Sequence, residues 1–335
     1  MTTSSPAVTD TQRVTEIAPP DGLAERASAA FLRGFLRVAF KPLIGPPFSP
    51  AIQRAWINAT AFTMPGRSGV GREWNHASGV AVEITTPKAG QKKGVILYVH
   101  GGAFCLANPA THRSVTSHLA FESGMAVWTP DYRLAPEAPY PAAPEDVATV
   151  YRHLVSTGIA PSQIVLAGDS AGATLALALA IQLRDEQQAM PACVVLISPV
   201  TDPDLSGITM FSRSSADPMI QSGWLRQGLG WYDCPAGTAT HTPLATPLQG
   251  LPPMLIQVGD QELLLSDSTR LAQHAVQCGV DCSIEIYLKR WHVFHLQSFF
   301  LRSSVLAIRS MAAFANRYVG CNSIAPLSVQ SEMVQ

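Results

Sequence analysis

The sequence predicts an α/β fold in which a mostly parallel sheet is covered by helices on both faces. Short apolar runs, typical of strands buried on both faces, alternate along the chain with stretches of helical periodicity. Of the 335 residues, 47% are hydrophobic and only 14% are charged, so the chain can fill a large core.

The expected strands follow one another as apolar or β-branched runs bounded by glycine, proline or polar residues. They are residues 81–84, 95–99, 125–129, 164–167, 194–197, 255–258 and 284–288. Helices are expected at residues 144–155, 171–184, 267–277 and 297–318. The stretch 171–184 is apolar nearly all round, which is typical of a buried helix.

One turn in this pattern carries chemical meaning. Gly168-Asp169-Ser170-Ala171-Gly172 joins the strand 164–167 to the helix that follows it. Small residues two before and two after a serine let strand and helix crowd together, with the serine hydroxyl presented from a strained backbone. The pattern predicts a nucleophile elbow, although a lone Gly-x-Ser-x-Gly also occurs in ordinary glycine-rich turns.

A second glycine-rich loop follows the strand 95–99. In His100-Gly101-Gly102-Ala103-Phe104 the small side chains leave backbone N–H groups uncovered. With the N–H of Ala171, those of Gly102 and Ala103 are the expected donors of an oxyanion hole, which holds the negative charge that develops during acyl transfer. The alternative is a tight turn whose glycines only permit positive φ.

A carboxylate and a later histidine complete the set in the chain order that such hydrolases require. Asp260 and Glu262 follow the strand 255–258, and His292 and His295 follow the strand 284–288. A serine, a carboxylate and a histidine can therefore meet at the ends of strands.

Together these motifs resemble the hormone-sensitive-lipase-like (bacterial family IV) carboxylesterases of the α/β-hydrolase superfamily. The resemblance covers residues 75–318 and is carried by the segments 100–104, 131–137, 168–173, 259–267 and 292–294. It implies an α/β-hydrolase fold with a helical cap over Ser170, no cofactor and no metal. One departure is Ala103, which stands where the family has glycine and is expected to narrow the adjoining pocket by a methyl group.

The resemblance also bears on the acid and the base. The family's acid is followed two positions on by leucine and then by another acidic residue, which Glu262 matches through Leu264 and Asp267. Asp260 is the alternative acid. The family's base precedes x-Phe, which is His292, whereas His295 is expected to pack within the C-terminal helix. Two histidines three apart can also bind a metal, but no third ligand lies near them in a zinc-like spacing.

Domain boundaries follow from the same resemblance. Residues 1–75 and 203–248 are expected to form the two cap segments, and residues 76–202 and 249–320 the catalytic domain. Residues 321–335 are expected to be a disordered tail. Aromatic and apolar cap residues are expected to line an acyl pocket: Phe31, Phe35, Trp56, Phe211, Trp224, Leu225, Trp231 and Tyr232.

Two groups of charged residues, in the segments 27–40 and 131–137, are expected to have structural roles. Arg33 and Arg37 lie four apart on one face of an amphipathic helix over residues 27–40, which either packs on the body of the protein or forms a lid. Asp131, Arg133 and Glu137 are expected to form a buried ion-pair network that positions the oxyanion loop.

Composition excludes several classes of partner. The net charge of −1 and the absence of a basic cluster beyond Lys92-Lys93 argue against a nucleic-acid surface. The six cysteines lack paired spacing and are expected to be buried thiols. The N-terminus lacks the basic start and apolar core of a secretory signal, and residues 27–40 are too short to span a bilayer, so we expect a cytoplasmic protein without stable membrane insertion. A homodimer is left open.

The expected function is that of a serine carboxylesterase acting on short- to medium-chain acyl esters through Ser170, His292 and Glu262, with an acyl-enzyme. A lactonase or an arylformamidase-type hydrolase would use the same side chains. A non-catalytic receptor on the same scaffold is a remote alternative, because the plant gibberellin receptors of this kind have lost the histidine that His292 represents here.

Overall fold

A nine-stranded sheet forms the centre of the computed structural model, which describes residues 13–320. The strands lie in the order β1-β9-β8-β7-β6-β4-β5-β3-β2. Every neighbouring pair from β1 to β5 is parallel, and the β5–β3 and β3–β2 pairs are antiparallel. The strands are β1 (Arg13–Ile17), β2 (Val70–Ala77), β3 (Val80–Pro87), β4 (Val95–Val99), β5 (Ala126–Pro130), β6 (Ile164–Asp169), β7 (Cys193–Ile197), β8 (Met254–Gly259) and β9 (Cys282–Tyr287).

The predicted α/β fold is confirmed, and the seven expected strands correspond to β3 through β9. The strands β1 and β2 are additional, and β1 and most of β2 lie within residues 1–75, which were expected to form a cap segment throughout. Both expose most of their residues to solvent, so neither has the apolar pattern of a buried strand. Among the described N-terminal residues, the helices therefore lie between β1 and β2.

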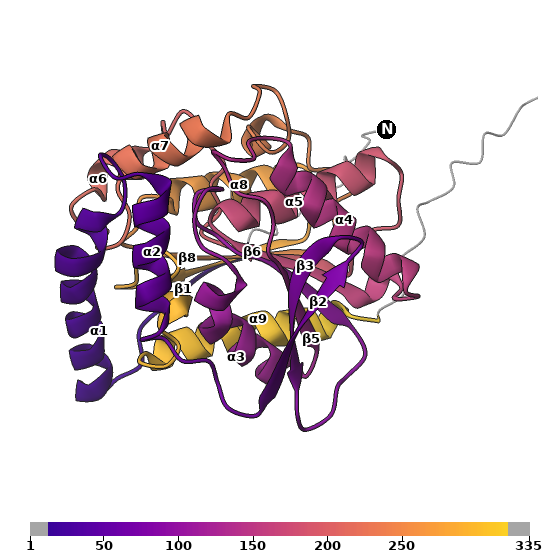
Figure 1. Ribbon diagram of the computed structural model, residues 1–335, viewed down its shortest axis with the longest axis horizontal. Coiled ribbons are helices and arrows are strands. Elements are labelled where there is room, and N and C mark those ends of the chain that lie inside the picture. Colours follow the sequence, from indigo (N-terminus) through magenta and orange to yellow (C-terminus); the bar gives the residue numbers. More distant parts are fainter. Residues whose placement is uncertain (1–12, 321–335) are drawn as a thin grey trace, which may run out of the picture.

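Helices cover both faces of the sheet, as Figure 1 shows. The helices α4 (Ala142–Ser156), α5 (Ala171–Asp185) and α8 (Leu265–Gln277) lie on one face, and α3 (Arg113–Ser123) and α9 (Arg302–Tyr318) on the other. Strands β4, β6, β7 and β8 are buried along their whole length because helices pack on both sides of them. The expected C-terminal helix begins later than predicted, since Phe294–Gln297 form a separate 3-10 turn.

Four helices lie together at one end of the molecule (Figure 1). They are α1 (Leu23–Phe35) and α2 (Pro50–Ala61) from the N-terminal segment, and α6 (Ile208–Ser212) and α7 (Ser222–Tyr232) from the insertion after β7. The helix α1 continues as a π-helical turn at Leu36–Phe40. Together these two elements correspond to the amphipathic helix expected over residues 27–40, and Leu32, Leu36 and Phe40 lie on its buried side. No helix within residues 13–320 has both the length and the apolar character needed to cross a lipid bilayer.

The cysteines of the described chain are all free thiols. Cys105, Cys193 and Cys282 are buried, while Cys234 and Cys278 are half-buried. The sixth cysteine, Cys321, and the tail expected at residues 321–335 lie outside the described residues, as do residues 1–12.

A buried ion pair joins α1 to the body of the protein. The Arg290 guanidinium donates to Glu25 and to Ser303 Oγ, and both charged residues are at most 3% exposed. The other Glu25 oxygen accepts the N–H of Arg302 at 2.9 Å, at the start of α9. Through these contacts Glu25 holds α1, α9 and the loop before His292 together. Its negative charge also stabilises the N-terminal end of α9.

Removing one partner of this pair should destabilise the fold strongly. We expect Glu25→Gln to lower the free energy of unfolding by about 3–5 kcal/mol, because it leaves the Arg290 charge buried and unpaired. Urea denaturation followed by circular dichroism measures the change. Arg152→Ala is the matched control, since Arg152 forms an exposed 3.6 Å pair with Glu186, and it should change the unfolding free energy by less than ~1 kcal/mol. Equal losses in the two variants would contradict the prediction.

Candidate active site

The predicted nucleophile lies at the turn from β6 to α5. Ser170 has φ 53° and ψ −124°, a left-handed conformation that a serine adopts only under constraint. The constraint comes from the two glycines of the motif. A Cβ on Gly172 would lie 2.1 Å from the Val99 carbonyl oxygen, and one on Gly168 would lie 2.6 Å from that of Gly172. Only glycine allows strand and helix to approach this closely, and the approach forces the turn at Ser170.

The histidine predicted as the base lies in hydrogen-bond contact with this serine. His292 Nε2 is 3.1 Å from Ser170 Oγ, and the imidazole is buried. Val293, the next residue, has φ 45°, which is rare for a β-branched side chain. The turn at Val293 directs the chain from His292 into the 3-10 turn Phe294–Gln297.

Glu262 lies on the other side of the imidazole. Its Oε1 is 3.6 Å from His292 Nδ1, longer than an ordinary hydrogen bond, so the two groups are in ion-pair contact. Its Oε2 accepts hydrogen bonds from Ser198 Oγ at 2.9 Å and from the Gly259 N–H at 3.2 Å. Burial alone disfavours the imidazolium, but the Glu262 carboxylate outweighs it and raises the pKa of His292 above its usual value.

Asp260, the alternative acid, has other partners. Its carboxylate lies against the backbone N–H groups of Lys289 and Arg290, and its own N–H donates to the Tyr287 carbonyl at 3.1 Å. Asp260 therefore holds the loop that leads from β9 to His292. The structure brings Ser170, His292 and Glu262 together, while Asp260, two residues before Glu262 in the same loop, lies against the backbone of Lys289 and Arg290 instead.

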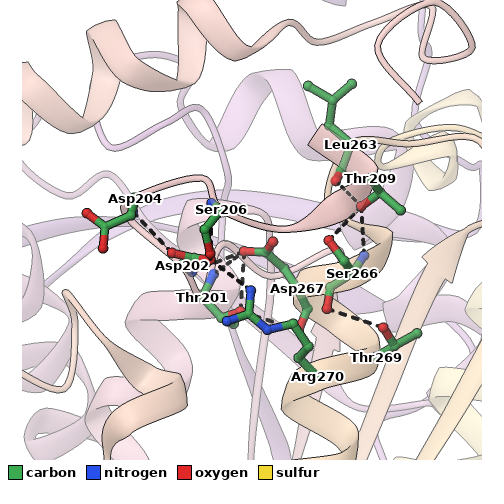
Figure 2. A network of polar contacts seen from close by, with 10 residues as sticks. All are labelled: Thr201, Asp202, Asp204, Ser206, Thr209, Leu263, Ser266, Asp267, Thr269 and Arg270. Carbon is green, nitrogen blue, oxygen red and sulfur yellow. Dashed lines mark hydrogen bonds and ion pairs between the residues drawn. The ribbon is translucent and has the colours of Figure 1, made fainter. Parts of the chain in front are cut away.

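The helix that follows Glu262 is fixed by a polar network, shown in Figure 2. Asp267 Oδ2 accepts the N–H groups of Thr201 at 2.9 Å and Asp202 at 3.1 Å. Asp202 in turn accepts from Arg270 Nη1 at 2.8 Å. Burial raises the pKa of Asp267 to about 6. The network ties α8 to the chain that leaves β7.

The oxyanion loop has an unusual backbone. Gly102 has φ 115°, and a Cβ there would lie 2.2 Å from the Leu106 carbonyl oxygen, while Ala103 has φ 52°. Within the described chain, the N–H groups of Gly102, Ala103 and Ala171 donate to no other residue. They are therefore available to a bound oxyanion.

Ala103 does not narrow the pocket as expected. Its methyl group faces the cap helix α7, where a Cβ on Gly228 would lie only 2.7 Å from it. The extra carbon is accommodated because α7 has glycine at the point of contact. His100, at the start of the loop, stacks on Tyr132 at 4.3 Å between ring centroids, and burial lowers the pKa of His100 to about 3, which keeps the ring neutral.

The expected network of Asp131, Arg133 and Glu137 is not buried, and all three residues are exposed. Arg133 instead pairs with Asp146 at 2.8 Å on the surface. The loop after β4, which this network was expected to position, is instead contacted by an arginine of α2. Arg54 of α2 donates to the carbonyls of Cys105 at 2.9 Å and Ala135 at 2.8 Å, and to Glu137.

Asp169, inside the elbow, contacts the side chains of Tyr98 and His112, in keeping with a structural role. It accepts from the Tyr98 hydroxyl at 2.8 Å and lies 3.3 Å from His112 Nε2. Burial disfavours the charged carboxylate, but His112 and Tyr98 outweigh it and lower the pKa of Asp169. The ionised group faces the same cavity as Ser170.

An apolar cavity of about 390 Å³ opens over Ser170 between α1 and α2. Of the expected lining residues, Phe31, Phe35 and Trp224 line it. Phe211 is 88% exposed, and Tyr232 is buried against Phe104 at 4.0 Å between ring centroids. The cavity wall also contains residues that the sequence did not single out: Leu32, Leu36, Phe40, Ile57, Met64, Met219, Leu296 and Phe300.

Sequence reasoning missed Arg54, Ser198 and Asp217, a buried carboxylate described below. Each is a single polar residue outside any motif, and each has a partner that is distant in sequence: the Cys105 carbonyl for Arg54, the Glu262 carboxylate for Ser198 and the Leu263 N–H for Asp217. No spacing in the sequence identifies such contacts. The signal that could have helped is the pair Asp217-Pro218, because aspartate often begins a turn.

Comparison with known proteins agrees with this arrangement. A family described as an alpha/beta hydrolase fold matches residues 96–296. An acetyl-hydrolase of Streptomyces hygroscopicus is 39% identical over 236 residues, which are 69% of this chain and 78% of that protein. An esterase of Acinetobacter venetianus is 37% identical over 224 residues, 66% of this chain and 74% of that protein.

Comparison with solved structures shows that the similarity covers most of the fold as well as the sequence. A crystal structure of an esterase from the bacterial hormone-sensitive lipase family superposes with a TM-score of 0.82 at 31% identity, and the match covers 90% of this chain and all of that one. A family match over more than half the chain and relatives above 30% identity lead to one conclusion. The chain belongs to the α/β-hydrolase family, among the hormone-sensitive-lipase-like esterases, and it is a serine hydrolase of carboxylic esters.

Proposed function

We propose that this enzyme cleaves short- to medium-chain acyl esters through Ser170, His292 and Glu262, with an acyl-enzyme intermediate. The observation that carries the proposal is the 3.1 Å contact between Ser170 Oγ and His292 Nε2 at the floor of an apolar cavity. A serine held against a buried imidazole, which itself lies beside a carboxylate, is the arrangement of an activated nucleophile.

The proposed reaction has two halves. His292 Nε2 takes the Ser170 proton as Oγ attacks the ester carbonyl carbon, and the N–H groups of Gly102, Ala103 and Ala171 hold the oxyanion. The carbon–oxygen bond to the alcohol then breaks, and His292 returns the proton to the leaving alkoxide. Water repeats these steps on the acyl-enzyme and releases the acid.

The role of Glu262 in this scheme is to fix the His292 ring and stabilise the imidazolium. The 3.6 Å separation supports that role because contacts of this kind tighten once the imidazolium carries a charge. Ser198 and Gly259 hold the far oxygen of the carboxylate, so the near oxygen stays directed at His292.

The cavity bears on the substrate class. Its wall is formed largely by aliphatic and aromatic side chains from α1, α2 and the loop before α9, which favours the hydrocarbon chain of an ester over a charged group. The Streptomyces relative named acetyl-hydrolase indicates that small acyl groups also react in this family.

The three side chains can be tested in one assay of p-nitrophenyl butyrate hydrolysis. Ser170→Ala should reduce kcat about 10⁴-fold or more, and Glu262→Gln about 10³–10⁴-fold, because each removes a member of a cooperating set. Asp260→Asn should cost less than about tenfold, since that carboxylate lies against a backbone loop rather than His292. A larger loss in Asp260→Asn than in Glu262→Gln, with both variants folded by circular dichroism, would reverse the assignment of the acid.

Arg54 provides a test of the oxyanion loop. We expect Arg54→Ala to lower kcat about tenfold with little change in KM, because it frees the Cys105 carbonyl and lets the N–H donors drift from the oxyanion. Glu137→Gln is the matched control. It removes the exposed charge that pairs with Arg54 but leaves the contacts to the loop, and it should change kcat by less than about twofold. Equal effects of the two variants would show that the ion pair, not the loop contact, matters.

Acyl preference follows from the cavity. In a series from acetate to palmitate esters, kcat/KM should peak at butyrate to octanoate, and Phe35→Trp should move the peak to shorter chains because Phe35 lines the cavity. Phe211→Trp should leave the peak in place, since Phe211 is 88% exposed. Preference for acetate over every longer ester, or faster cleavage of a lactone or aryl amide in the same panel, would contradict the proposed substrate class.

A further inference from the structure

Three basic side chains, those of Arg33, Arg37 and Lys41, form a basic stripe on the N-terminal helices and bind the segment 214–217, which lies after β7. Arg33, Arg37 and Lys41 are spaced by four residues along α1, its π-helical continuation and the 3-10 turn Lys41–Leu43 that follows, so their side chains share one face. All three donate to backbone carbonyls of residues 214–217. Arg33 Nη1 reaches the Ala216 carbonyl at 3.3 Å, Arg37 Nη2 reaches that of Ser215 at 3.0 Å, and Lys41 Nζ reaches that of Asp217 at 2.7 Å.

Asp217, the last residue of that segment, is wholly buried, with 0% of its surface exposed. Its Oδ1 accepts the N–H groups of Met219 at 2.8 Å and Ile220 at 3.0 Å, which closes a local turn. Its Oδ2 accepts the N–H of Leu263 at 3.1 Å. Leu263 directly follows Glu262, so a carboxylate from the cap holds the loop that carries the proposed acid.

Asp217 is also an electrostatic neighbour of the histidine. The charged groups that face it are His292, Glu262, Lys41 and Arg33, contributed by the β9 loop, the β8 loop and α1. Burial raises the pKa of Asp217 to about 6, partly offset by the charge of His292. In a water-poor site a charge acts beyond hydrogen-bond distance, so an ionised Asp217 favours the imidazolium form of His292.

We propose that Asp217 is a positioning residue for ester hydrolysis, which fixes the Glu262 loop through the Leu263 N–H and supplies a second buried negative charge within electrostatic range of His292. The basic stripe of α1 holds Asp217 in place, so the two cap segments and the Ser170–His292–Glu262 set form one connected unit. This inference rests on the proposed roles of Ser170, His292 and Glu262.

The test is the pH profile of Asp217→Asn, which keeps the size of the side chain and removes its charge. We expect kcat at neutral pH to fall about 10- to 100-fold, because small displacements of catalytic groups have effects of this size. The loss of a nearby negative charge should also lower the pKa of His292. Since the base must be neutral to act, the acidic limb of kcat/KM should move to lower pH.

Asp202→Asn is the matched control. Asp202 also closes a local turn, accepting the N–H of Asp204 at 3.1 Å, but its outward partner is Arg270 rather than the Glu262 loop. It can be followed in Figure 2. Asp202→Asn should lower the melting temperature while the acidic limb stays at the wild-type pH. An acidic limb that does not move in Asp217→Asn, or that moves equally in both variants, overturns the proposal.

A second variant covers the case in which Asp217→Asn does not fold. Arg37→Met/Lys41→Met removes two surface side chains that hold residues 214–217 and leaves Asp217 itself intact. A lower kcat with KM unchanged supports the proposal, and an unchanged kcat overturns it. Ser170→Ala is run alongside: if it is as active as the wild type, the proposed function fails. If it is inactive and Asp217→Asn keeps the wild-type profile, only this inference fails.

Discussion

The close approach of β4 to the elbow at Gly172 is the contact on which the site depends. The carbonyl oxygens of Val99 and His100 occupy the space that any side chain at Gly172 would need. This approach places the loop after β4 beside the turn after β6, so Ser170 lies next to the proposed oxyanion donors. This contact requires glycine.

Backbone strain is concentrated around the same place. Ser170, Ala103, Ser198 and Val293 all adopt left-handed conformations, with φ between 45° and 53°. Each such residue costs roughly 1–3 kcal/mol, and such residues cluster where surrounding structure fixes them for function. The fully buried strands β4, β6, β7 and β8 supply that rigid surrounding, because the strained residues lie in the segments that follow the parallel strands β4, β6, β7 and β9.

The sequence predicted the buried half of the molecule well because burial leaves a pattern. Strands β3 to β9 and helix α5 are apolar runs of the expected period, and the elbow motif locates Ser170. The order of strand ends then led to Asp260 or Glu262 and to His292 or His295, and the family resemblance selected Glu262 and His292, which lie 3.6 Å apart in the structure. Predictions were wrong where an element is polar, as with β1 and β2, or where contact is between a side chain and distant backbone, as with Arg54. The prediction of a buried ion-pair network at Asp131, Arg133 and Glu137 was wrong. The spacing of charged residues does not by itself distinguish a buried network from exposed ion pairs.

The polar strand β1 has a consequence for how the chain behaves among other copies of itself. It pairs in parallel with β9 from Arg13–Ser283 to Ile17–Tyr287, and the Leu288 N–H donates to the Ile17 carbonyl at 2.9 Å. Without residues 13–17, β9 would present a row of open backbone groups at the rim of the sheet, which invites strand addition by neighbouring molecules. A short ribbon bearing Arg13 and Glu16 thus shields the strand that leads to His292 from self-association, and trimming it would favour aggregation before it impaired chemistry.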